Sequence, residues 1–286
     1  MTAPAVPPTT AGDPAAAPVP ADRDGARGAA SFADRAQYLA LRGAVGVLGA
    51  LPWRAATAVG SALGRFGYVG VRVRRDVVER QIAAAFPELG GDRVREIARA
   101  SYESLGRTTI EAALVPALGR EGILGLFSRV DGWELGGSYV AARGVPIDGV
   151  ARRMANPLFD DFLTGPRERL GMHVVWDGHA VRRTPRSLKE NRIVAMVSDQ
   201  GAAGLASTYV PFFGRPAKTP RGPAVFALRL RVPMLFGAAI RQPDGRFALT
   251  FEPIPVEDTG DRERDVDAIV ATYTAMLERW VRRYPE

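Results

Sequence analysis

The sequence predicts an α/β fold in which a largely parallel central sheet is flanked by helices. From residue 134 onward, short apolar segments alternate with amphipathic ones, and Gly or Pro separates most of them. Strands that alternate with helices are typical of parallel sheets, because each crossover helix returns the chain to the start of the next strand. In such sheets, sites form where the strands end and the loops begin.

The expected elements follow in chain order. We expect strands at 145–151, 172–176, 193–199, 233–240 and 246–254, the fourth buried and the fifth half-exposed. We expect helices at 134–144, 156–171, 179–192 and 220–231. A last helix carries its apolar residues on one face: Val266, Ile269, Val270, Tyr273, Met276, Leu277 and Trp280.

Three regions are expected along the chain: 1–30, 31–73 and 74–286. The first is rich in Ala and Pro and cannot bury enough apolar surface to fold, so we expect a disordered tail. It lacks the basic segment followed by an apolar one that a signal peptide has. The third is the α/β domain, and it begins with two helical stretches at 74–89 and 91–114.

Region 31–73 is expected to be helical and membrane-associated. It is small and apolar but is interrupted by Arg42, Arg54 and Arg65, so it holds no uncharged stretch of the roughly 18 residues that a membrane span needs. We expect two short helices that meet at Leu51-Pro52-Trp53. Apolar faces flanked by Arg suit a membrane interface. Two ordinary core helices would show the same pattern.

The net charge of +7 favours an anionic partner. Nucleic acid, phospholipid headgroups or a phosphorylated substrate would fit. A genome that prefers Arg to Lys would give the same excess. Nucleic acid is the weakest of these readings, because the cations are scattered and no RNA- or DNA-binding signature accompanies the aromatic residues. The absence of Cys excludes disulfides, a thiolate nucleophile and Cys-based zinc sites.

Polar side chains follow two of the expected strands. Asp199 ends one strand, and Arg152 and Arg153 follow another. An Arg at a strand end can hold a phosphate or carboxylate through two hydrogen bonds, while a cap, a turn or a solvated loop is the structural alternative. The aromatic loop at 210–223 sets apolar side chains beside cations, as an amphiphile with an anionic head requires. A purely structural loop fits that segment as well.

Together, in this order, several segments resemble the lysophospholipid acyltransferase-like family, which includes the late acyltransferases of lipid A biosynthesis. The resemblance runs from about Tyr38 to the end of the sequence, and its last two motifs are the most specific. It rests on "AAAFPEL" (83–89), "GWELGG" (132–137), "RRMANPLFD" (152–160), "RERLG" (167–171), "SDQG" (198–201) and "VPFFGRPAKTPRGPAVFALR" (210–229).

The resemblance implies a glycerolphosphate-acyltransferase-like fold and an enzyme on the cytoplasmic face of the inner membrane. Such an enzyme moves a fatty acyl chain from acyl carrier protein, or from acyl-CoA, to a hydroxyl of a glycolipid. A His and an acid spaced His-x4-Asp or His-x4-Glu activate that hydroxyl, because a hydroxyl is a poor nucleophile at neutral pH. The acid orients the imidazole, and no metal or redox cofactor is required.

Carried over by position, the resemblance implies catalytic roles for Glu134, Arg152 and Asp199. Glu134 matches the acid of the dyad, Arg152 the basic residue before Asn-Pro, and Asp199 the acid that ends the later strand. The implied substrate-binding residues are Arg153, Asn156, Gln200, Phe212, Phe213, Gly214, Arg215 and Lys218.

The histidine of the dyad has no match in this sequence. Counting back five positions from Glu134 gives Arg129, and a guanidinium cannot act as a base at physiological pH. In the family, a segment like "VDGWE" comes first, and a strand and His-x-Gly-Asn-Trp-Glu follow, so Trp-Glu occurs in both segments. Here one Trp-Glu, at 133–134, stands in the place of both. We therefore infer that the segment between them, with the first core strand and the His, is missing. The alternative is that no segment is missing and Arg129 simply replaces the histidine.

The two other histidines do not rebuild the dyad. The residue five places after His173 is Gly178, and the residue five places after His179 is Thr184. We expect His173 in a strand and His179 at a turn or helix start. Loss of a central strand also predicts a damaged or rearranged sheet edge near residues 127–147, because unpaired backbone groups are costly.

Overall fold

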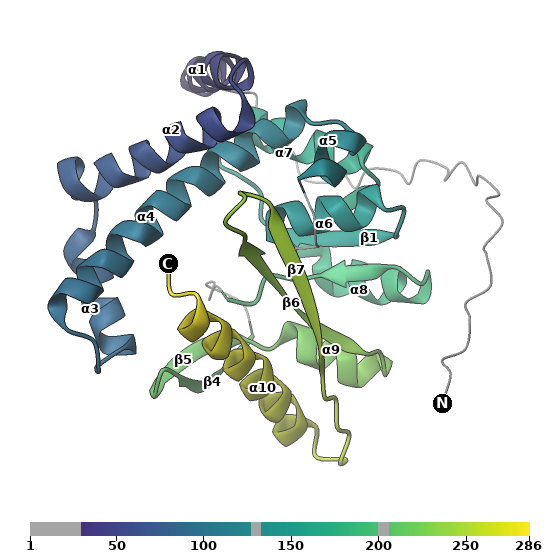
Figure 1. Ribbon diagram of the computed structural model, residues 1–286. Helices are drawn as coiled ribbons and strands as arrows, with labels where there is room; N and C mark the ends of the chain where they lie inside the picture. The colour runs from purple at the N-terminus through teal and green to yellow at the C-terminus, as the bar shows by residue number, and fades with distance from the viewer. Residues whose placement is uncertain (1–29, 127–132, 200–205) are drawn as a thin grey trace, which may run out of the picture.

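The computed structural model describes residues 30–126, 133–199 and 206–286, and Figure 1 shows a helical arm followed by a mixed α/β body. The tail expected at 1–30 lies outside the described residues, except for its last residue. The arm consists of α1 (Phe32–Gly49), α2 (Trp53–Phe66), the π-helix η1 (Gly67–Val71), α3 (Arg75–Ala85) and α4 (Gly91–Leu114).

Several helix positions in this arm agree with those expected from the sequence. The bend falls at Leu51-Pro52-Trp53 as expected, since α1 ends at Gly49 and Pro52 caps the start of α2. Proline suits this position because its fixed φ and missing N–H cost nothing where a helix begins. Helix α4 has the expected bounds, and α3 ends just before Pro87.

Glycines let α2 and α4 approach closely. A Cβ at Gly64 would lie 1.9 Å from the carbonyl oxygen of Tyr102, and one at Gly106 would lie 2.2 Å from the carbonyl oxygen of Gly60. No side chain fits in such a space, so the two helices pack backbone to backbone along Gly60, Gly64 and Gly106. Small residues four apart on one helix face permit this contact.

Helix α1 lies on the outside of the arm (Figure 1) and buries none of its residues. A capping box holds its first turn, in which Ser31 and Asp34 bond to each other's backbone N–H groups. Its exposed face includes Phe32, Leu39 and Val47. Among the described residues, no helix is long and apolar enough to cross a bilayer.

The body contains a three-stranded parallel sheet in the order β2-β1-β3. Its strands are β1 (Ile147–Ala151), β2 (Met172–Trp176) and β3 (Ile193–Ala195). The elements before and between them are η2 (Val115–Ala117), α5 (Arg120–Gly125), α6 (Trp133–Ala142), α7 (Pro157–Arg169), η3 (Asp177–His179) and α8 (Ala180–Lys189). The predicted alternation of strands and helices is therefore confirmed, although β3 is four residues shorter than the expected 193–199.

The prediction of one largely parallel central sheet was wrong in extent. Within the described residues, two separate antiparallel hairpins follow the parallel sheet: β4 (Ser207–Phe212) with β5 (Arg215–Pro220), and β6 (Met234–Arg241) with β7 (Phe247–Ile254). Turns as short as 242–246 can join only antiparallel neighbours, since a parallel crossover needs a dozen or so residues. Strand β6 was also expected to be buried, yet Leu235 is 60% exposed.

The segment 210–223 was expected to be a loop and instead forms most of the β4–β5 hairpin. Its turn is Phe213-Gly214, and both residues have positive φ, 50° and 69°. Positive φ at both central positions matches the right-handed twist of the flanking strands. Pro211 pairs with Pro216 in this hairpin. Prolines argue against a central strand but are compatible with an isolated edge pair, and this hid the hairpin in the sequence.

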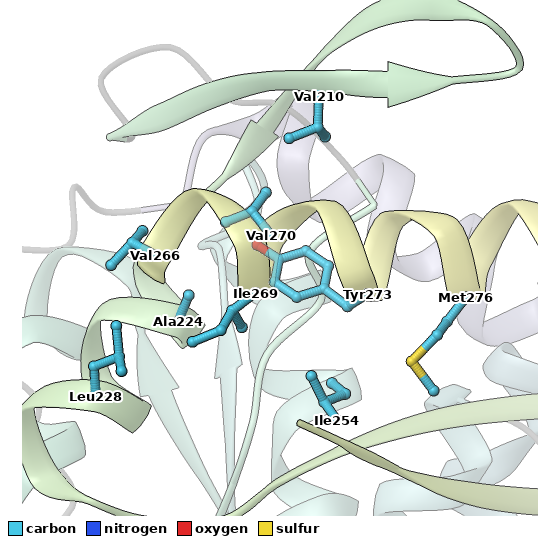
Figure 2. Packing of buried hydrophobic residues seen from close by; sticks show 9 residues of the cluster. All are labelled: Val210, Ala224, Leu228, Ile254, Val266, Ile269, Val270, Tyr273 and Met276. Carbon is cyan, nitrogen blue, oxygen red and sulfur yellow. The ribbon is translucent and has the colours of Figure 1, made fainter. Parts of the chain in front are cut away.

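The main core lies between α10 (Arg262–Arg283), α9 (Gly222–Leu230) and the two hairpins (Figure 2). The predicted apolar face of the last helix is confirmed, since Val266, Ile269, Val270, Tyr273 and Met276 are all buried. Val210, Ala224, Leu228 and Ile254 pack against them. The Tyr273 hydroxyl donates to the carbonyl of Pro220, which ties α10 to the end of β5.

The sheet damage expected near 127–147 falls partly on residues 127–132, which lie outside the described residues. From Ile147 onward the sheet is intact, since β1 is its central strand and pairs with β2 on one side and β3 on the other. The β6–β7 hairpin forms a separate two-stranded sheet.

Candidate active site at the carboxyl edge of the parallel sheet

Arg152 and Asp177 meet where β1 and β2 end. Parallel pairing sets Ala151 opposite Trp176, so the next residues along both strands are neighbours. The Nε of Arg152 lies 3.0 Å from Oδ2 of Asp177. The Arg152 side chain is 61% exposed, and exposed ion pairs contribute little to stability. The guanidinium is therefore accessible to an anionic group of a ligand.

Arg153, in contrast, is held by its surroundings. Its guanidinium lies over the Trp176 ring, 3.9 Å from the centroid, and its Nη1 donates to Oδ2 of buried Asp160 at 3.1 Å. The other oxygen of Asp160 accepts from the backbone N–H of Met154 at 3.2 Å. These contacts hold the loop after β1, next to Arg152.

Asn156 joins this edge to the helical arm. Its Oδ1 accepts from the N–H of Leu158 at 3.0 Å and so caps α7. Its Nδ2 donates to the carbonyl of Asp34 at 3.1 Å and to Oε1 of Gln37 at 3.3 Å. Both acceptors belong to α1, so one amide side chain connects α1 to the strand-end loop.

Aromatic contacts strengthen the same junction. The rings of Tyr38 and Phe162 lie 6.3 Å apart and nearly perpendicular. The Arg42 guanidinium lies 5.6 Å from the centre of the Phe162 ring. Helix α1 thus lies against α7, beside the carboxyl edge of the sheet.

Glu134 and Asp199 lie in segments next to the parallel sheet. Four residues separate α6, which contains Glu134, from the start of β1, and Ala141 in the last turn of α6 packs against Ile147 and Met172. The structure describes the backbone at Glu134 but not its side chain. Asp199 is exposed and lies four residues beyond β3. Gln200 lies in 200–205, outside the described residues, so no contact between these groups is established.

The predicted aromatic residues form a junction of their own. Phe212 and Phe213 lie edge to face, with ring centroids 4.8 Å apart. Phe213 also packs against Phe86 at the end of α3, at 5.1 Å, and under the Arg282 guanidinium, at 4.5 Å. Its backbone N–H donates to Oε2 of Glu278 at 2.6 Å. This turn therefore links the hairpin to α3 and α10.

The other three predicted residues of the hairpin are open to solvent. Gly214, Arg215 and Lys218 are exposed on the hairpin. Gly214 has room around its Cβ position but needs a positive φ, which side chains tolerate poorly. The two cations are thus available to a ligand, and Gly214 serves the turn.

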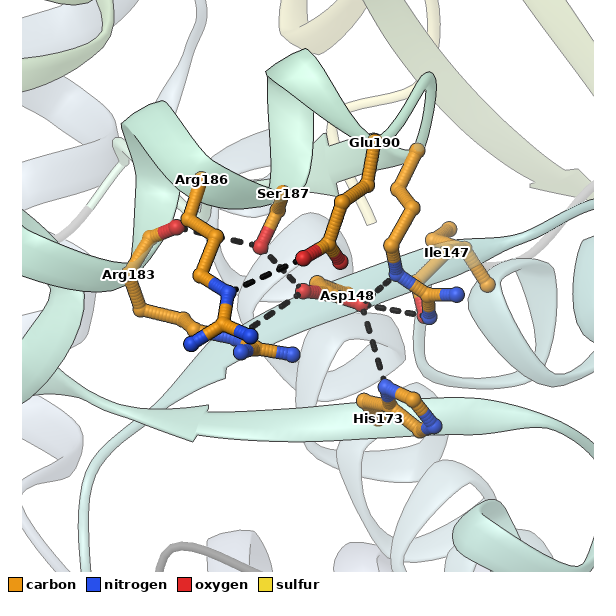
Figure 3. Close-up of polar contacts among 8 residues, drawn as sticks. Ile147, Asp148, His173, Arg183, Arg186, Ser187 and Glu190 are labelled. Atoms are coloured by element: carbon orange, nitrogen blue, oxygen red, sulfur yellow. Dashed lines mark hydrogen bonds and ion pairs between the residues drawn. The ribbon is translucent and has the colours of Figure 1, made fainter. Parts of the chain in front are cut away.

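Sequence reasoning missed a buried polar cluster around Asp148 (Figure 3). Asp148 lies in the middle of the sheet and is 0% exposed. Its Oδ1 accepts from Nε of Arg192 at 2.6 Å, and Ser187 donates its hydroxyl to Oδ2. Nε of Arg183 lies 3.8 Å from Oδ2, and Nδ1 of His173 lies 3.6 Å from Oδ1. The sequence feature that could have revealed this cluster is Asp148 itself, an acid within an otherwise apolar strand.

The cluster does not have the geometry of a hydrolytic triad. Ser187 bonds to the carboxylate and not to the imidazole, so no base is set to take its proton. Burial lowers the pKa of His173, and the positive charge of Arg192 lowers it further. His173 is therefore neutral at neutral pH. The cluster holds α8 on the sheet and anchors Arg192 at the start of β3.

His173 and Glu134 lie on opposite faces of the sheet. Ile147 and Met172 pack against Ala141 of α6. Asp148 and His173, one residue further along each strand, therefore point to the other face, where α8 supplies Ser187 and Arg183 (Figure 3). His173 cannot replace the histidine of a dyad with Glu134. His179 lies at the carboxyl edge, two residues after Asp177, and is half-buried.

Comparison with known proteins decides the family. The sequence model described as bacterial lipid A biosynthesis acyltransferase matches residues 119–286, which is more than half of the chain. The chain belongs to the bacterial lipid A biosynthesis acyltransferase family. The family match includes every site residue that the sequence predicted and leaves α1 to α4 outside. A search of individually curated proteins gives no match.

Proposed function

We propose that this protein serves acyl transfer at a membrane surface. The donor is a thioester of acyl carrier protein or of coenzyme A, and the acceptor is a hydroxyl of a glycolipid on the cytoplasmic face of the inner membrane. Membership of the lipid A acyltransferase family supports the reaction class. The substrates and the location are part of the proposal.

The observation that carries the proposal is the link that Asn156 makes between α1 and the strand-end loop. Through it, a helix with exposed Phe32, Leu39 and Val47 lies beside exposed Arg152. An apolar helix face flanked by Arg suits the interface of a bilayer. A lipid acceptor held in that bilayer would meet the carboxyl edge of the sheet without leaving the membrane.

The carboxyl edge offers part of the chemistry that acyl transfer needs. The Arg152 guanidinium, which pairs with Asp177, can stabilise the oxyanion that forms when a hydroxyl attacks a thioester carbonyl. Glu134 is the acid that would orient an imidazole, and Asp199 and Gln200 would complete the edge. The proton of the attacking hydroxyl still needs a base.

The second candidate function is binding of lipid or acyl carrier protein without turnover. It is favoured by the position of His173 on the sheet face opposite α6, and by the spacing of His179, which has Thr184 five residues later. Acyl transfer would then require the strand and histidine that we infer to be missing between Val130 and Leu135. A distant third candidate, nucleic-acid binding, has no feature of the site in its favour.

The decisive experiment is to sequence the genomic DNA and the transcript across the codons for Val130 to Leu135. An in-frame segment that encodes His-x4-Glu would support an active enzyme. Codons that run from Val130 to Leu135 without an inserted segment would support binding without turnover. Acyl transfer is then measured with purified chain, acyl carrier protein thioester and glycolipid. Turnover by the 286-residue chain, retained in both His173→Gln and His179→Gln, would contradict the need for a histidine base.

A further inference from the structure

The far end of the helical arm carries an unusual turn. The π-helix η1 (Gly67–Val71) is followed by Arg72 and Arg74, which both have left-handed backbone conformations with φ of 59° and 51°. The Tyr102 hydroxyl holds the turn by donating to the carbonyl of Val73. Val71 and Val73 are exposed and alternate along the chain with the exposed Arg72 and Arg74. We call residues 66–74 the tip.

Next to the tip lies an open cavity of about 340 Å³, formed by η1, the start of α3 and the N-terminal part of α4. Its lining supplies three guanidinium groups and two carboxylates. The lining residues are Tyr68, Val69, Arg75, Asp92, Arg95, Glu96 and Arg99.

The floor of the cavity is fixed. The Tyr68 hydroxyl donates to Oε1 of Glu79 at 2.6 Å, and Nε of Arg75 donates to the same oxygen at 2.7 Å. The Arg75 guanidinium also lies 4.6 Å from the centre of the Tyr68 ring. Shared, partly buried hydrogen bonds of this kind hold side chains in one position.

The two outer arginines are held only weakly. Arg99 has Glu103 as a distant partner, with 3.8 Å between Nε and Oε1. Arg95 pairs with Asp92, whose side chain is fully exposed. Exposed ion pairs contribute little, so either guanidinium can exchange its carboxylate for a phosphate, which it binds with two hydrogen bonds.

Val69 connects the cavity to the tip, because it lines the cavity and is itself exposed. We propose that the cavity binds the phosphate of a phospholipid headgroup while Phe66, Val71 and Val73 enter the apolar layer of the bilayer. An apolar projection beside cations matches the charge and polarity of an anionic membrane surface. The proposal rests on the membrane location in the proposed function.

This site is distinct from the strand-end site. Helix α4 has 24 residues and begins beside the cavity, so at 1.5 Å per residue it extends about 36 Å from there. Figure 1 shows the tip at the outer end of the arm, away from β1. Two separated membrane contacts, the tip and α1, would fix the orientation of the body above the bilayer.

The first test is calorimetric titration of the full chain with dihexanoyl phosphatidylglycerol, kept below its micelle concentration. Saturable binding is expected, and Arg99→Gln should weaken it about tenfold, since a hydrogen bond to a charged group is lost. The control is Arg186→Gln, an exposed arginine on α8, which should bind as the unchanged chain does. Equal affinity in Arg99→Gln would overturn the proposal. Equal affinity for inorganic phosphate would also overturn it, because the site would then recognise an ion and not a lipid.

The second test is flotation of the chain with phosphatidylglycerol-containing vesicles. The double change Val71→Asp and Val73→Asp should lower binding about tenfold or more, because two apolar side chains no longer leave water. Leu235→Asp, at an exposed apolar position on β6, is the control and should have no effect. Unchanged flotation of the double variant would overturn this proposal alone. Absence of any flotation by the unchanged chain would overturn the membrane location as well.

Discussion

Phe86 and Phe213 lie edge to face with ring centroids 5.1 Å apart. They belong to two segments, "AAAFPEL" and "VPFFGRP", that the family resemblance picked out separately. The structure shows one reason why both segments matter. Together with the Arg282 guanidinium over the Phe213 ring, they form the joint between the helical arm, the β4–β5 hairpin and α10.

Replacement of Phe86 should therefore weaken the whole protein. Phe86 is buried, and Phe86→Ala should lower the free energy of unfolding by about 3–5 kcal/mol, as core Phe-to-Ala changes do. Phe86→Leu should cost less, since it retains most of the volume. Urea denaturation followed by circular dichroism measures both. A loss in Phe86→Ala no greater than in Phe86→Leu would show that the joint does not hold the arm.

The close approach of α2 and α4 gives a second prediction. Gly64→Ala would set its methyl group against the Tyr102 carbonyl, so it should lower the free energy of unfolding by about 1–3 kcal/mol or more. The matched control is Gly46→Ala in α1, where a Cβ meets nothing within 4 Å. That change should stabilise by about 0.5–1 kcal/mol, because alanine loses less entropy in a helix. Thermal unfolding should therefore show a lower free energy of unfolding for Gly64→Ala and a higher one for Gly46→Ala. A stabilised Gly64→Ala would contradict the backbone contact.

The fold was most predictable from the sequence where a single apolar pattern extends over many residues. Helix α4 and the buried face of α10 follow from their apolar periodicity, and the bend at Pro52 follows from the fixed φ of proline. The β4–β5 hairpin did not follow, because its prolines suggested a loop. The antiparallel pairing of β6 and β7 depended on the short turn 242–246, whose geometry the apolar pattern of the strands does not reveal.

The candidate site was predictable only in part, for a physical reason. Arg152 was found because it follows a strand, but its partner Asp177 comes from another strand, and pairing across a sheet depends on register. The cluster around Asp148 draws Ser187 and Arg192 from distant positions. Only the folded chain brings such groups together, and periodicity carries no signal for them.

The neutral state of His173 predicts a loss of stability in mild acid. Its pKa in the folded chain is lowered, first by burial and then by Arg192, so below the unfolded value of about 6.5 the unfolded chain binds more protons. The free energy of unfolding should fall as the pH drops from about 6.5 toward the lower pKa of the folded chain. Above about pH 6.5 the contribution of His173 to stability should be fully retained. His173→Gln should give a flatter profile over the same range. Parallel profiles for the two chains would contradict a partly buried, neutral imidazole.

The buried pair of Glu111 and Arg241 gives a fourth prediction. Glu111 is 1% exposed, and burial raises its pKa while the bond with Arg241 lowers it. Arg241→Met would leave a buried carboxylate without its partner, so the free energy of unfolding should fall by about 3–5 kcal/mol. The double variant with Glu111→Leu should recover most of that loss, because no buried charge remains. A double variant as unstable as the single one would contradict this account of the pair.

Asn156 allows the cap of α7 to be separated from the attachment of α1. Asn156→Asp keeps an oxygen for the N–H of Leu158 but loses the amide that donates to Asp34 and Gln37. Since aspartate caps helices as well as asparagine does, α7 should stay intact while amide hydrogen exchange in α1 becomes faster. Asn156→Ala should speed exchange in α1 and also cost about 1 kcal/mol through loss of the cap. If exchange in α1 is unchanged in both variants, other contacts, such as Tyr38 on Phe162, hold the helix beside the strand ends, and the link that carries the proposed function would have to be assigned to them.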